Sequence, residues 1–109
     1  MTVTVTAPTS VVDNLIAIPG VRSVQLSWLP PSDTDPNAIV DNYNLICIPQ
    51  ITDFVTIKTS YSRPGIHRVV GFHPATEYNC SIAASNSAGY GPSSAVTVLT
   101  MDECKMRNI

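Results

Sequence analysis

The stretch PATEYNCSIAASNSAGYGP, residues 74–92, decides the fold of this chain. Its first half alternates strictly, so that Tyr78, Cys80, Ile82 and Ala84 share one face, as the inward residues of a half-buried strand do. Its second half consists of small residues with glycine and proline, which is typical of a tight turn. Such a stretch fits a catalytic site, a metal site or the corner of a β-sandwich, and the rest of the sequence favours the corner.

The same period-two alternation recurs along the chain, and no segment holds a helical period for three turns. Pro-, Gly-, Asn- and Asp-bearing breaks separate the alternating segments. Because one face of each sheet must be buried, seven short strands predict two antiparallel sheets packed as a sandwich. The expected strands are VVDNLIAI (11–18), VRSVQLSWLPP (21–31), DNYNLICIP (41–49), DFVTIKT (53–59), GIHRVVGF (65–72), TEYNCSIAAS (76–85) and SSAVTVLT (93–100).

The composition bounds the class of protein. The chain has 109 residues, of which 44% are hydrophobic and 13% are charged, which is typical of one globular domain. Its net charge is −2 and its basic residues are scattered, so we expect no nucleic-acid partner. No apolar run approaches the roughly 20 residues of a membrane span. The N-terminus MTVTVTAPTS does not resemble a signal peptide, which predicts either a cytosolic protein or an excised fragment with an added start Met.

Residues able to carry chemistry are few and badly spaced for it. His67 and His73 have no Cys, Asp or His at a metal-ligand spacing. Asp33, Asp35 and Asp41 fall near one loop but lack the spacing and the bidentate Glu of a calcium site. We therefore expect no catalytic residue, no metal site and no cofactor.

The alternating segments carry a family pattern. It comprises Pro8, Asn14-Leu15, Val24-x-Leu26-x-Trp28-x-Pro30-Pro31, Tyr43-x-Leu45, Pro74-x-Thr76-x-Tyr78 and Ala84-x-Asn86-x-x-Gly89-x-Gly91-Pro92-Ser93. Each motif is weak alone, but their order and spacing over residues 8–101 resemble a fibronectin type III domain. The resemblance implies an all-β, seven-stranded, antiparallel immunoglobulin-like β-sandwich.

The resemblance also assigns core roles. It implies that Trp28 is the central core aromatic, that Tyr78 is the tyrosine corner, and that Phe72 fills a slot where the family usually has Leu. Alternation adds further inward-facing residues to this expected core, namely Tyr43, Leu45 and Ile82.

The cysteines leave two readings open. In the family, the strands that hold Cys47 and Cys80 are neighbours in one sheet, and alternation points both side chains into the core. They therefore form either a disulfide or two buried thiols that act as small hydrophobes. Most members of the family lack such a bridge. Cys104 lies beyond the last strand and is either free or paired outside this fragment.

Two surface residues are candidates for modification or contact. Asn79 begins an Asn-Cys-Ser triplet, which is either a glycosylation acceptor or a chance match. Tyr90 is the aromatic residue of the loop that would follow the sixth strand, and it either touches a partner or folds over the sheet edge.

The function implied is a non-enzymatic interaction and spacer module in the extracellular region of a larger adhesion or receptor-like protein. Residues 1–7 would be the tail of a preceding domain or a linker, because TVTV (2–5) echoes AVTV (95–98), unless that echo is chance. Residues 102–109 would be a C-terminal linker or tail. The expected partners are other proteins, including neighbouring domains of the same chain. The alternatives are a module of a cytosolic muscle or cytoskeletal giant protein and a spacer domain of a secreted hydrolase.

Overall fold

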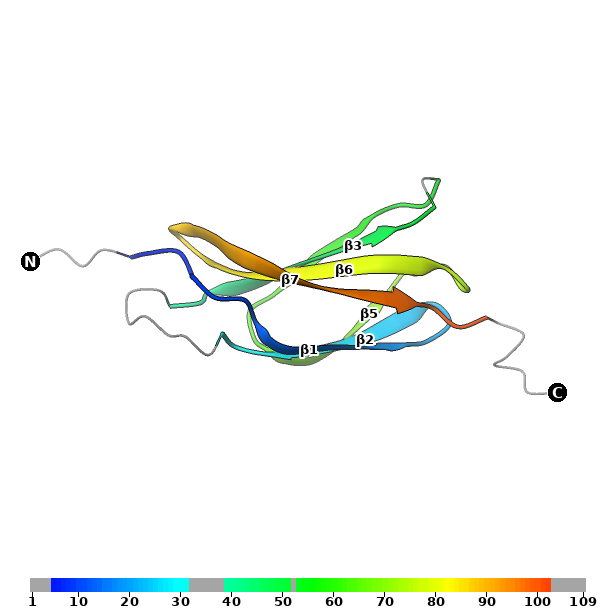
Figure 1. Ribbon diagram of the computed structural model, residues 1–109, viewed down its shortest axis with the longest axis horizontal. Helices are drawn as coiled ribbons and strands as arrows, with labels where there is room; N and C mark the ends of the chain where they lie inside the picture. Colours follow the sequence, from blue (N-terminus) through cyan, green and yellow to red (C-terminus); the bar gives the residue numbers. More distant parts are fainter. Residues whose placement is uncertain (1–4, 32–38, 52, 103–109) are drawn as a thin grey trace, which may run out of the picture.

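A computed structural model describes residues 5–31, 39–51 and 53–102. These residues form seven β-strands along an elongated body, with the two ends of the described chain at opposite ends of its long axis (Figure 1). The strands are β1 (Asp13–Pro19), β2 (Ser23–Leu29), β3 (Asn42–Pro49), β4 (Ile57–Tyr61), β5 (Gly65–Val70), β6 (Glu77–Asn86) and β7 (Gly89–Leu99).

The strands make two antiparallel sheets that pack face to face. One sheet has the order β1-β2-β5 and the other the order β4-β3-β6-β7, and the two lie as separate layers (Figure 1). The predicted seven-stranded sandwich is therefore confirmed. Inward positions are apolar along each strand, as in β2, where Val24, Leu26 and Trp28 are buried.

The last strand differs from the sequence-based expectation. It begins at Gly89 instead of Ser93, because Asn86 pairs with Gly89 and leaves only Ser87 and Ala88 as the turn. The Asn86 Oδ1 atom accepts a 2.9 Å hydrogen bond from the Ala88 amide, and Gly89 has φ 144°. A side chain closes this turn, so the pattern of small residues suggested a longer loop than the hydrogen bonds allow.

The fourth strand also differs. It covers Ile57–Tyr61, later than the expected 53–59. The ring of Phe54 stacks on the ring of His73, with centroids 3.7 Å apart. This contact with a residue far along the chain keeps the segment before Ile57 out of the sheet.

The core is centred on Trp28, which is 1% exposed. Its indole contacts rings from three other strands: Tyr43 in β3, Tyr61 in β4 and His67 in β5, with centroid distances of 5.7, 5.8 and 5.0 Å. One side chain thus holds both sheets together. The other expected core residues are also buried, namely Tyr43, Leu45, Phe72, Tyr78 and Ile82.

Tyr78 ties the turn between β5 and β6 to the core. Its hydroxyl accepts a 2.9 Å hydrogen bond from the His73 amide, and its ring meets Phe72 edge-on at 4.6 Å. Two buried threonines extend the network: Thr100 Oγ1 donates to the His73 carbonyl at 2.6 Å and accepts from the Thr76 amide at 2.9 Å. Every polar end of this corner therefore has a partner, as burial requires.

Removal of the central ring should destabilise the whole sandwich. We expect Trp28→Ala to lower the free energy of unfolding by about 3–5 kcal/mol, through lost burial and the cavity left behind. Val55→Ala is the control, because Val55 is 80% exposed and its loss should cost less than about 0.5 kcal/mol. Urea unfolding monitored by circular dichroism measures both, and equal midpoints for the two variants would contradict the central role of Trp28.

Candidate partner-binding surface

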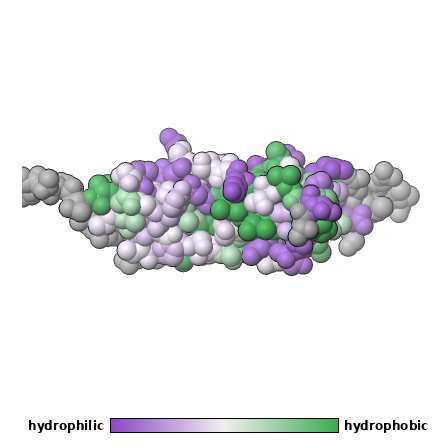
Figure 2. Space-filling view, turned by 90° about the horizontal axis from the view of Figure 1, so that it is seen from above, coloured by the Kyte–Doolittle hydropathy of each residue, from purple (hydrophilic) through white to green (hydrophobic). Residues whose placement is uncertain are grey.

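A shallow hollow lies on the outer face of the four-stranded sheet. It has a volume of about 550 Å³ and is floored by small side chains of β6 and β7, among them Ser81, Ala83 and Ser93. Ile46 and Lys58 rise on one side and Tyr90 on the other. Figure 2 views the molecule of Figure 1 from above, and the face that it shows mixes apolar and polar residues.

The start of β7 positions Tyr90. This residue pairs with Ser85 across a register shift between Ala83 and Ser85, and it is 71% exposed. The hydroxyl of Ser85 is held below it by Asn44, whose Nδ2 atom donates at 2.7 Å. Tyr90 is thus an exposed aromatic ring on a regular strand beside a floor of small residues. Its contact with a partner stays a prediction.

The charge of the hollow is simple. Lys58 is the one ionised side chain among the residues that line it, and the remaining lining groups are apolar, hydroxyl or amide. The hollow therefore places an aromatic ring and a cation beside a floor of small side chains.

The segment before β1 is fastened to the turn between β6 and β7. Asn86 Nδ2 donates to the carbonyl of Thr6 at 2.7 Å and to the carbonyl of Ile39 at 3.0 Å. Gly91 allows close approach, because a Cβ atom there would lie 2.8 Å from the Pro8 carbonyl oxygen. The sequence motif contained Asn86 and Gly91, but it gave no sign that they hold the N-terminal segment.

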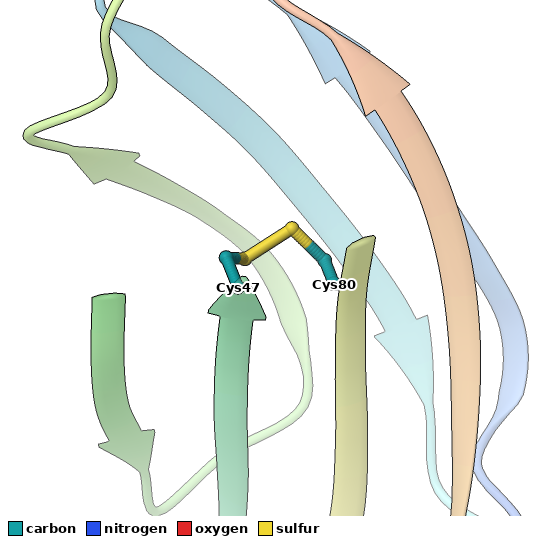
Figure 3. The surroundings of a disulfide bond; sticks show 2 residues. All are labelled: Cys47 and Cys80. Carbon is teal, nitrogen blue, oxygen red and sulfur yellow. A yellow bond between two sulfur atoms is a disulfide. The ribbon is translucent and has the colours of Figure 1, made fainter. Parts of the chain in front are cut away.

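Cys47 and Cys80 are joined by a disulfide. They lie opposite each other in the register of β3 and β6, and both are fully buried. Figure 3 shows the bridge linking the two neighbouring strands directly. Of the two readings left open by the sequence, the structure therefore has the disulfide.

Asn79 and the histidines lie in different environments. Asn79 is exposed on the outer face of β6. Within β5, Ile66 takes the exposed position and His67 points inward, stacked on Tyr61 at 4.1 Å. His67 Nε2 lies 2.9 Å from the Arg63 carbonyl oxygen.

The described residues do not gather a metal-binding cluster. Over residues 5–31, 39–51 and 53–102, no three His, Cys, Asp or Glu side chains form a group that could hold a metal ion. Burial raises the pKa of the Tyr43 phenol. The same residues contain no helix with the length and apolar character needed to cross a membrane. Asp33, Asp35 and Cys104 lie outside the described residues.

Known proteins share both sequence and fold with this chain. The fibronectin type III domain family model matches residues 6–100. Human Roundabout homolog 2 is 33% identical over 69 residues, which cover 63% of this chain and 5% of that protein. Cell adhesion molecule Dscam1 of Drosophila melanogaster is 37% identical over 94 residues, with coverage of 75% of this chain and 4% of that protein. The chain therefore spans a small part of these relatives.

Solved structures agree in fold. The crystal structure of chicken CNTN1 FN1-FN3 domains superposes with a TM-score of 0.74 at 22% identity, covering 89% of this chain and 33% of that one. The FN5 domain of Drosophila Lar superposes with a TM-score of 0.69 at 23% identity, covering 86% and 98%. With the family match spanning most of its length, this chain belongs to the fibronectin type III domain family.

Proposed function

We propose that this chain is one unit of a tandem array in the extracellular region of a larger adhesion or receptor-like protein. In that array it serves as a non-enzymatic spacer that also presents a protein-binding surface. The placement of the chain ends carries the proposal: they leave opposite ends of the long axis, and the N-terminal segment is fastened to the domain (Figure 1). A unit built in this way transmits length and direction to its neighbours.

Two further observations support the extracellular placement. Disulfides persist in oxidising compartments and are rare in the cytosol, and this domain holds one in its core. The sequence relative from Drosophila melanogaster is named a cell adhesion molecule. The binding role draws on the hollow beside Tyr90, because Tyr brings a large contact area at a low cost in conformational entropy.

The alternative, a cytosolic module with reduced thiols, differs from this proposal in the number of free thiols per chain. After expression in an oxidising compartment, we expect one reactive thiol per denatured chain, that of Cys104, because Cys47 and Cys80 are bonded. Titration with a thiol reagent in guanidinium measures this. Three free thiols would count against the extracellular placement.

The bridge closes a long loop and should contribute on the order of 3–4 kcal/mol to the free energy of unfolding. We therefore expect the double variant Cys47→Ala/Cys80→Ala to have a lower midpoint of urea unfolding than the unmodified chain.

The spacer role predicts an ordered entry to the domain. Asn86→Ala removes the bonds to Thr6 and Ile39, and Gly91→Ala places a Cβ atom against Pro8. We expect both variants to release the segment before β1 and to lower the free energy of unfolding by about 1–2 kcal/mol. Amide NMR order parameters for residues 6–12 measure the release, with Ser87→Ala as the control in the same turn. Unchanged order parameters in both variants would rule out this anchor.

The binding role predicts that truncation of Tyr90 weakens binding to a partner without destabilising the fold. Tyr90→Ala should change the free energy of unfolding by less than about 0.5 kcal/mol, because the ring is exposed. A tetramer of the domain should lose its binding to a defined array of cell-surface ectodomains when Tyr90 is truncated. Leu99→Ala is the control, because Leu99 is exposed at the far end of the same strand. If Tyr90→Ala unfolds the domain, or if Leu99→Ala abolishes the same binding, the hollow is not the contact site.

A further inference from the structure

The outer face of the three-stranded sheet is aliphatic. Its five large apolar side chains are 51–69% exposed, and we call them the aliphatic face: Ile16, Ile18, Leu29, Ile66 and Val70. Outward positions of a solvated sheet are normally polar. A contiguous apolar patch on a small domain marks a surface that something covers.

The register shows that four of these side chains lie around Ser27, whereas Val70 pairs with Ser23 and lies beyond Arg68 on β5. Ile16, Ser27 and Ile66 form one row across β1, β2 and β5, so that Ser27 leaves a shallow dip between two large residues. Ile18, Gln25 and Arg68 form the next row. The apolar surface around Ser27 is therefore formed by Ile16, Ile18, Leu29 and Ile66, and Gln25 and Arg68 separate Val70 from it.

The charges near this face lie at opposite corners. On β5, Arg68 lies opposite Gln25, which precedes Ser27 by two residues in β2. On β1, Asp13 lies opposite Leu29, which follows Ser27 by two residues in β2. The side chain of Arg68 is exposed and that of Asp13 is partly exposed. The face thus carries one cation and one anion across a diagonal.

We propose that this face binds the same face of a second copy of the chain. A two-fold axis in the plane of the contact, perpendicular to the Asp13–Arg68 diagonal, exchanges the two corners. Each Asp13 then meets the partner's Arg68, while the aliphatic centres cover each other and the strands of the two copies cross at a large angle. An apolar face with one anion and one cation at opposite corners is complementary to a second copy of itself, and every copy supplies one.

The size of the face sets the strength of the contact. Three strands about 4.8 Å apart with seven residues at about 3.4 Å span about 14 by 24 Å, or about 340 Å² per copy. Stable dimers bury about 800 Å² per partner. The affinity should therefore be weak, with a dissociation constant on the order of 0.1–1 mM. In a tandem array on one cell surface, a high effective concentration would allow a contact of this affinity to form.

The first experiment locates the contact. Sedimentation equilibrium of the Cys104→Ser chain, from about 20 µM to about 1 mM, should show reversible dimers without an intermolecular disulfide. Ile16→Thr/Ile66→Thr keeps β-branched residues in both strands and should weaken association by about tenfold or more. Ile48→Thr, an equivalent change on the outer face of the other sheet, should leave association unchanged. A monomer at every concentration overturns the proposal, and so does loss of dimers in Ile48→Thr alone.

The second experiment tests the orientation. Asp13→Arg and Arg68→Asp should each weaken association by about tenfold, and exchange of both charges in one chain should restore it. Amide chemical shifts of the unmutated face on dilution provide a readout that does not depend on a variant's folding. They should change in β1, β2 and β5. Changes confined to β3, β6 and β7 would overturn the proposal, as would a double exchange that stays as weak as either single variant.

Discussion

The contact of one indole ring with rings from three other strands is the constraint on which this structure depends. Trp28 reaches from β2 to Tyr43, Tyr61 and His67, so it fixes the spacing of the two sheets and the position of the fourth strand beside the third. Its Nε1 atom has no hydrogen-bond partner among the described residues. The ring therefore stabilises the fold chiefly through burial, dispersion and its contacts with the three neighbouring rings.

The two poles of the sandwich are held by different means. Near the C-terminus, the Tyr78 hydroxyl and two buried threonines satisfy the turn after β5, and the Met101 amide donates to the Gly20 carbonyl at 2.8 Å. Near the N-terminus, one amide side chain, that of Asn86, holds three backbone groups. Both ends of the described chain are thus bound to the body, as the proposed spacer role requires.

The two outer faces have different chemistry. The four-stranded sheet presents mixed polar and apolar groups around a hollow, with Tyr90 and Lys58 on its walls. The three-stranded sheet presents aliphatic side chains with one charge at each of two corners. Because the sheets pack back to back, a partner on one face leaves the other accessible. The two proposed contacts, one between copies and one with a different protein, therefore do not compete for the same face.

The sequence by itself determined the architecture, because period-two alternation and the spacing of Trp28 and Tyr78 depend on local patterns that burial imposes directly. Alternation pointed Cys47 and Cys80 into the core, and the family resemblance placed them in neighbouring strands. Their direct opposition is a matter of register, which only the paired strands decide. The anchor by Asn86 and the contact of Phe54 with His73 likewise join residues far apart in the chain. The early start of β7 depends instead on the local pairing of Asn86 with Gly89, which the pattern of small residues concealed. The hollow and the aliphatic face belong to the same class: each gathers side chains from several strands, and only tertiary structure brings those strands side by side.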